Sequence, residues 1–249
     1  MLISAGLALP RQVFAHGFML DKGAKMSKTA GNVLDPDQMA ALMSVDGVRY
    51  AVLREVPFDR DADVSYDSFV RRYNADLAND FGNLLNRTLT MTGRFLEGER
   101  PAPAPGGELG SAWASAWAAY SKSMDSFLLN QALEALWDFV GHANRFVDDE
   151  QPWSLNKAAK AGDAEAADRL RSTLADLLEA CRVVGLAAAP FMPAAAARVF
   201  GQLGLQWPFG ADGAGGPRLT DLAAWGGSGG GGRIGAQEIL FPRVEIEAA

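Results

Sequence analysis

Apolar residues recur every three or four positions through most of this 249-residue chain, which is the spacing of amphipathic helices. The longest such stretch covers residues 67–97, and a break is expected near Asn74. Its buried face is predicted to consist of Leu77, Phe81, Leu84, Thr88, Met91 and Phe95. Further helical patterns lie at about 111–123, 131–149, 163–188 and 193–203. Amphipathic helices joined by short connections predict a mainly α protein built around a helical bundle.

Both ends of the chain depart from this helical pattern. Residues 2–9 resemble the last turn of a helix, and 12–20 alternate and are rich in strand formers, which predicts a strand or a strand pair. Near the C-terminus, "GGSGGGG" (226–232) has the composition of a flexible linker. The "EILFPRVEI" that follows alternates like a short strand.

The segment between the first strand and the bundle contains recognisable helix starts. Asp35 and Pro36 supply an N-cap and a proline at the first helical position. A second short helix is expected from Asp46 to just before Pro57, and Ser65 is placed to cap the long helix.

Composition restricts what this fold can bind. The net charge of −7 argues against general binding to nucleic acid or to anionic membranes, so any polyanion site must be local. Residues 1–28 are locally basic, with one arginine and three lysines against a single aspartate. One cysteine and two histidines provide neither a disulfide nor a set of metal ligands, so we expect no metal site. No apolar run is long enough to span a bilayer, and a cytoplasmic protein without membrane contact is expected.

The basic segment "DKGAKMSKTAGNVLD" (21–35) combines lysines with small residues. Two ammonium groups and several backbone N–H donors could surround a polyphosphate there. The glycine and lysine order of a P-loop is absent. On composition alone, a solvated hairpin loop with incidental lysines is the more common case.

The core of this loop resembles the KMSKS signature of class I aminoacyl-tRNA synthetases, with Thr29 replacing the last serine. The flanking "LPRQVFAHGFML", "GVRYAVLREVPFDRDADVSY" and "RYNADLANDFGNLLNR" resemble the methionyl-tRNA synthetases in particular, as do "QPW" and "LLEACRVVGLAAAPFMP". The resemblance implies the end of an α/β nucleotide-binding catalytic domain at 1–34, a connecting segment at 35–66 and a helical anticodon-binding domain at 67–225. A glycine-rich linker and a strand-like tail at 226–249 complete the expected division.

The resemblance also implies roles for particular residues. Lys25, Met26, Ser27 and Lys28 would bind ATP, delivered with Mg²⁺, and the two lysines would stabilise charge on its triphosphate during methionine activation. Such transfers need mainly positioning and positive charge from the protein. Phe14 and His16 would line the methionine pocket, although a lone histidine on an apolar strand is more often a core residue.

Recognition of the anticodon of tRNA-Met would fall to Asn83, Arg87 and Trp153. Asn83 and Arg87 are four residues apart and lie roughly 100° from the predicted buried stripe, so both can point outward. Trp153 follows Pro152 just past a predicted helix end, where an indole can stack on an unstacked base. Without the resemblance, a solvated helix flank and a core or capping tryptophan would be the simpler interpretations.

Some parts of such an enzyme are not in this sequence. It contains no His-x-Gly-His segment, and one cysteine cannot form a zinc knuckle. We therefore expect a C-terminal portion of a methionine–tRNA ligase that forms little methionyl-adenylate by itself. The alternative is a non-catalytic module that binds the anticodon of tRNA-Met, and a purely structural helical protein is a third and weaker interpretation. A monomer is expected.

Overall fold

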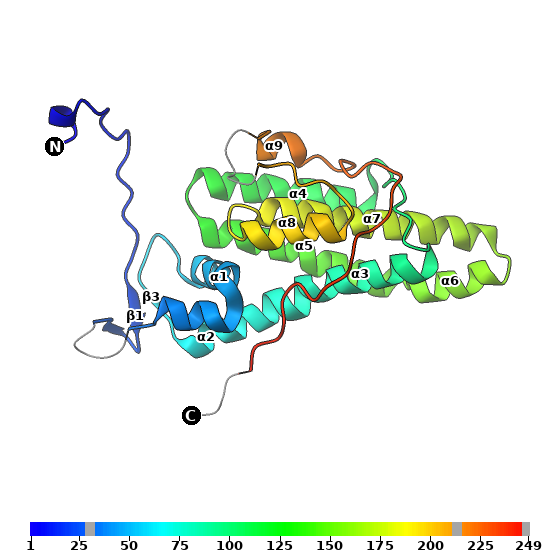
Figure 1. The fold of residues 1–249 in the computed structure, drawn as a ribbon, viewed down its shortest axis with the longest axis horizontal. Coiled ribbons are helices and arrows are strands. Elements are labelled where there is room, and N and C mark those ends of the chain that lie inside the picture. Colours follow the sequence, from blue (N-terminus) through cyan, green and yellow to red (C-terminus); the bar gives the residue numbers. More distant parts are fainter. Residues whose placement is uncertain (28–32, 211–215, 246–249) are drawn as a thin grey trace.

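The computed structural model describes residues 1–27, 33–210 and 216–245, most of which are helical. Figure 1 shows the helices gathered into one elongated body, from which the segment before β1 extends. In chain order the elements are η1 (Ile3–Ala5), β1 (Met19–Asp21), β2 (Ala24–Lys25), α1 (Pro36–Glu55), β3 (Ala62–Asp63), α2 (Tyr66–Arg72), η2 (Tyr73–Phe81), α3 (Gly82–Phe95), α4 (Gly107–Asp125), α5 (Leu129–Glu150), α6 (Pro152–Lys160), α7 (Ala164–Ala188), α8 (Pro193–Gln202) and α9 (Leu219–Leu222). The predicted mainly α fold with a helical bundle is confirmed.

The bundle is organised around α5 and α7. Helix α5 contacts α4, α7, α1 and η2, while α7 contacts α3, α4, α6 and α8. A single apolar core runs through all of these helices, and its fully buried members include Tyr50, Leu84, Leu133 and Phe191. No helix within the described ranges is both long and apolar enough to cross a membrane.

The predicted long helix is present as α2, η2 and α3 in unbroken succession. Ser65 caps it as expected, because Ser65 and Ser68 each accept a hydrogen bond from the other's backbone N–H. In place of a break near Asn74, residues 73–81 form a π-helix, which adds backbone without interrupting the helix. The predicted stripe is buried except for Phe95, which is half-buried.

Helix α1 also differs from the prediction. Asp35 caps it as expected, accepting a hydrogen bond from the N–H of Asp37 at 2.9 Å. The helix bends at Met43 and Ser44, and the hydroxyl of Ser44, not Asp46, accepts a hydrogen bond from the N–H of Gly47 at the start of the second half. The carboxylate of Asp46 instead accepts a hydrogen bond from Ala195 at the start of α8, at 2.6 Å. A local sequence pattern could not reveal this tertiary partner.

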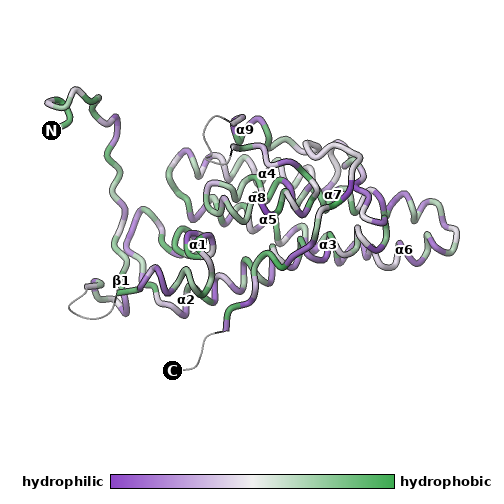
Figure 2. Tube along the Cα trace, in the orientation of Figure 1, coloured by the Kyte–Doolittle hydropathy of each residue, from purple (hydrophilic) through white to green (hydrophobic). Residues whose placement is uncertain are grey.

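The predicted strand at 12–20 is wrong over most of its length, since only Met19–Asp21 is a strand. In the three-stranded sheet, β1 pairs antiparallel with β2 and parallel with β3. In the part of the chain that the structure describes, residues 12–17 pair with no strand, although the carbonyl of Phe18 accepts a hydrogen bond from the N–H of Ala62 on β3, so strand propensity alone did not suffice. Figure 2 shows hydrophobic stretches in the segment before β1, where Val13, Phe14 and Phe18 are exposed.

The C-terminal segment packs along the bundle, and Figure 1 shows it crossing in front of α3. Composition predicted a linker at 226–232, yet the N–H groups of Gly226, Gly227 and Ser228 all donate to the buried carboxylate of Glu179. The predicted strand after it is wrong, because no residue from 234 to 245 is in a strand. This part is held instead by side chains, as where the amide of Asn74 bonds both the N–H and the carbonyl of Val244.

Candidate functional site

The lysine loop begins as a tight hairpin between β1 and β2. Lys22 and Gly23 form its two-residue turn, and both have a positive φ (51° and 75°), as a type I′ turn requires. The N–H of Gly23 donates to the carboxylate of Asp63 on β3 at 3.1 Å. The hairpin therefore presents the start of the loop at the edge of the small sheet.

Three of the four residues expected to bind ATP lie in the described part of this loop. Lys25 is exposed on β2, and its ammonium nitrogen lies 4.9 Å from the centroid of the Phe18 ring. Met26 packs partly against the core, and Ser27 is exposed. Lys28, the lysine expected to contribute most to catalysis, and Thr29 lie outside the described residues. The predicted roles of all four stay predictions.

The two residues expected at the methionine pocket both lie near Phe58. The ring of Phe14 is 5.5 Å from that of Phe58 and 4.9 Å from that of Phe127. His16 approaches Phe58 edge-on at 5.9 Å and lines a small apolar pocket of about 150 Å³ with Met19 and residues of α1. Phe14 is not among the residues that line this pocket. Their assignment to methionine binding stays a prediction.

Asn83 and Arg87 lie on the first two turns of α3. Asn83 is exposed, and Arg87 is half-buried, with 30% of its side chain accessible. The guanidinium of Arg87 donates to the carboxylate of Asp148 on α5 at 2.7 Å. The contact holds Arg87 against the neighbouring helix while Asn83 faces solvent.

Trp153 lies at the start of α6, a helix that the sequence analysis did not predict. Its residue exposure is 45%, which leaves much of the indole accessible. Helix α6 contacts α3, and Asp148 is only five residues before Trp153. The structure thus gathers all three predicted anticodon residues around the junction of α3, α5 and α6. Figure 1 shows that this junction and the strands lie at opposite ends of the body.

Two hydrogen bonds and an ion pair join η2 and α3 to α5 near these residues. The indole N–H of Trp137 donates to the carbonyl of Asp76 at 2.9 Å, and the amide of Asn144 donates to the carbonyl of Asp80 at 3.4 Å. The third is the Arg87–Asp148 pair. The flank of η2 and α3 that carries Asp80, Asn83 and Arg87 is therefore fixed against α5 along its length.

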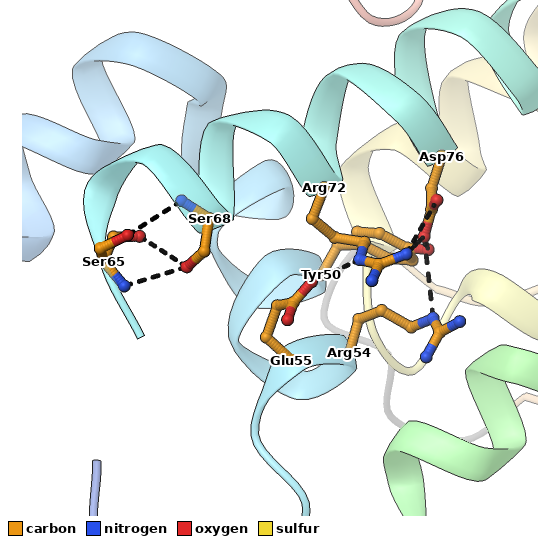
Figure 3. Close-up of polar contacts among 7 residues, drawn as sticks. All are labelled: Tyr50, Arg54, Glu55, Ser65, Ser68, Arg72 and Asp76. Carbon is orange, nitrogen blue, oxygen red and sulfur yellow. Dashed lines mark hydrogen bonds and ion pairs between the residues drawn. The ribbon is translucent and has the colours of Figure 1, made fainter. Parts of the chain in front are cut away.

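A polar network connects α2 and η2 to α1, the helix that follows the lysine loop in the chain. Figure 3 shows the carboxylate of Asp76 between the side chains of Tyr50, Arg54 and Arg72. Tyr50 donates to it at 2.5 Å, and Arg72 also binds Glu55 at 2.5 Å. Burial, together with the charge of Asp76, raises the pKa of Tyr50 well above its usual value, so the phenol stays protonated as a donor.

Sequence reasoning missed Asp76 and Asp148, because nothing in the local pattern shows that a carboxylate has a partner on a distant helix. The nearest signal in the sequence was position, since Asp76 directly precedes the predicted apolar stripe and Asp148 lies shortly before the "QPW" segment. No group of three or more His, Cys, Asp or Glu side chains among the described residues could hold a metal ion.

Two family models match the chain and together cover most of it. Residues 1–89 match the class I tRNA synthetases of the methionyl type. Residues 104–219 match the anticodon-binding domain of methionyl-tRNA ligase.

Curated relatives extend the match across nearly the whole chain. The methionine–tRNA ligase of Caldanaerobacter subterraneus is 36% identical over 256 residues, covering 99% of this chain and 37% of the relative. That of Mycobacterium tuberculosis is 40% identical over 210 residues, covering 82% of this chain and 39% of the relative. The chain thus spans a little over a third of the length of these relatives.

Solved structures agree with the sequence comparisons. Mycobacterium tuberculosis methionyl-tRNA synthetase in complex with methionyl-adenylate superposes with a TM-score of 0.78 at 35% identity, over 97% of this chain and 46% of that one. Its free form gives a TM-score of 0.77 at 32% identity over 98% of this chain. The chain belongs to the methionyl-tRNA synthetase family.

Proposed function

We propose that this chain is the anticodon-reading portion of a methionine–tRNA ligase. The observation that carries the proposal is the exposed Trp153 at the start of α6, a helix that contacts α3, on which Asn83 and Arg87 lie. An accessible indole is a stacking platform for an unstacked base, while amide and guanidinium groups hydrogen-bond to base edges or phosphates. The partner would be the CAU anticodon loop of tRNA-Met.

In the complete enzyme, the lysine loop would serve ATP-dependent activation of L-methionine before transfer to the tRNA. Lys25 and Lys28 would offset charge on the Mg²⁺-bound triphosphate, with Met26 and Ser27 shaping the loop around the nucleotide. Phe14 and His16 would face the amino acid. We infer a monomeric, cytoplasmic protein in which 1–34 belongs to the catalytic domain, 35–66 connects it, 67–225 binds the anticodon and 226–249 forms the C-terminal segment.

Binding to short RNA hairpins tests anticodon recognition directly. The chain should bind an anticodon stem-loop with CAU more tightly than one with a scrambled loop of equal length. Trp153→Ala should weaken CAU binding by on the order of 10-fold, because stacking on an aromatic side chain is worth about 1–3 kcal/mol per base. Phe127→Ala is the matched control, since Phe127 is also 45% exposed but lies in the turn between α4 and α5. Equal binding of both loops, or an equal loss in both variants, would contradict the proposal.

Catalysis is tested separately by methionine-dependent exchange between ATP and pyrophosphate. The chain alone should show little exchange, because it contains no His-x-Gly-His segment to complete the ATP site. An exchange rate like that of a full-length synthetase would show that the chain is an enzyme by itself. CAU-selective binding without exchange would favour the anticodon-binding module.

A further inference from the structure

Asp80 lies on the same flank of the helix as Asn83 and Arg87, and no contact among the described residues accounts for its carboxylate. It precedes Asn83 by three residues and Arg87 by seven, which places the three on one side of the helix. Arg87 reaches Asp148 on α5, and the backbone carbonyl of Asp80 is bonded by Asn144, one turn before Asp148. Asp80 and Arg87 therefore occupy corresponding places along the same edge of α5.

The carboxylate of Asp80 is half-buried, yet it has no hydrogen bond or ion pair with any residue in the described ranges. Burial, with the nearby charge of Asp76, raises the pKa of Asp80. Such a carboxylate costs free energy unless a hydrogen-bond donor reaches it. No donor among the described residues bonds to it.

Asn144 gives a second, independent sign that a donor is missing here. Its Nδ2 donates to the carbonyl of Asp80, while its Oδ1 is buried without a partner in the described part of the chain. Unpaired buried acceptors are uncommon in native proteins. Two acceptors for which the described residues supply no donor therefore lie on η2 and α5, the helices next to Arg87 and its partner Asp148.

Each of the proposed anticodon residues can donate a hydrogen bond, and none of them can only accept one. Arg87 can only donate, and Trp153 offers a ring face and one N–H, whereas Asn83 both donates and accepts. A base that presents an amino group needs an acceptor, and a carboxylate accepts from the N4 amino group of cytosine. Uracil and guanine present a carbonyl oxygen at the corresponding position, which a carboxylate would repel.

We propose that Asp80, supported by Asn144, is a specificity residue that reads the exocyclic amino group of an anticodon base. It would accept cytosine at the first position of CAU, or adenine at the second, and reject uracil or guanine there. The inference rests on the proposed function, since it requires the anticodon loop to lie on this flank. The proton stays on the base, and no covalent step is involved.

The test compares three stem-loops that differ only in the loop, with anticodons CAU, UAU and CGU. The wild-type chain should prefer CAU over the other two. Asp80→Asn keeps the side-chain size but adds an NH₂ donor that can face a carbonyl. This variant should reduce the preference at one of the two positions by on the order of 10-fold.

Asp149→Asn is the matched control, because it removes an equal charge from the exposed end of α5 next to Asp148. It should change affinity for all three loops together and leave their ratios unchanged. If Asp80→Asn keeps the wild-type ratios, or weakens all three loops equally, the inference is overturned while the proposed function stands. If the wild-type chain binds all three loops equally, the proposed function itself fails. Thermal unfolding of both variants verifies that they are folded.

Discussion

The guanidinium of Arg182 lies 2.7 Å from the carboxylate of Glu179, one turn earlier on α7, and only 5% and 0% of these side chains are accessible. Three backbone N–H groups of the glycine-rich segment complete the shell around Glu179, and Arg182 also donates to the carbonyls of Leu222 and Ala224. Burial raises the pKa of Glu179, but the hydrogen bonds and charge of Arg182 and the donors of the 226–228 segment outweigh it, so the pKa is lowered. The pair thus fastens the C-terminal segment to the bundle.

Glu179→Gln should lower the free energy of unfolding by about 3 kcal/mol, because it leaves Arg182 buried without its counter-charge. It also places an amide NH₂ group against backbone donors. Urea denaturation followed by circular dichroism measures the change. Glu134→Gln on the exposed side of α5 is the control and should stay within about 0.5 kcal/mol of the wild type. Equal stability of the two variants would refute a stabilising role for the pair.

The contribution of Asp176 to the free energy of unfolding should be lower above pH 6 than near pH 4. Burial raises the pKa of its carboxyl to about 6, although a hydrogen bond from the backbone of Ala104 opposes this. Between the unfolded pKa near 4 and the folded pKa, the folded state binds more protons, so stability falls as pH rises.

Asp176→Asn should therefore raise the melting temperature at pH 7.5, and the gain should disappear toward pH 4. Melting curves across this pH range provide the measurement. Asp138→Asn, at an exposed position on α5, is the control. A gain that is the same at both pH values would point to a cause other than titration of Asp176.

Tyr50 should be energetically coupled to Asp76, whose carboxylate also pairs with Arg54 and Arg72. Tyr50→Phe should cost about 2 kcal/mol, because it removes a buried bond to a charged acceptor. In an Asp76→Asn background the same substitution should cost clearly less. Denaturation of the two single variants and the double variant measures this coupling.

Tyr66→Phe, alone and combined with Asp76→Asn, is the control for this double-mutant experiment. The Tyr66 hydroxyl contacts Asp35 and Gln38, not Asp76, so its effect should add to that of Asp76→Asn. Additivity for Tyr50 as well would mean that the network in Figure 3 does not act as a unit.

Gly235→Ala should lower the free energy of unfolding by about 1–3 kcal/mol. A Cβ at Gly235 would lie 2.1 Å from the carbonyl oxygen of Gly201, so the C-terminal segment would have to move off α8. Gly201→Ala is the matched control. A Cβ there meets no atom of the described residues within 4 Å, and alanine in a helix should be neutral or slightly stabilising. Two variants of equal stability would contradict close packing of the segment.

The sequence itself determined much of the helical architecture. Apolar residues at three- and four-residue spacing located the bundle helices, and cap residues such as Asp35 and Ser65 located two helix starts, because both signals act within one or two turns. Helix α6 was missed since its nine residues carry only a short pattern. The KMSKS-type loop and the segments around Asn83 and Trp153 were recognisable because they are contiguous motifs.

Tertiary structure decided the features that depend on a partner far away in the chain. Strand-forming residues at 12–17 pair with no strand among the described residues, while the N–H groups of the glycines at 226–227 donate to Glu179. The environments of Asp76, Asp80 and Asp148 likewise depend on which helix lies opposite. The local sequence pattern determines whether a segment is helical and which of its faces is apolar. The free-energy cost of burying a charge depends instead on neighbours that only the folded chain brings within hydrogen-bond distance.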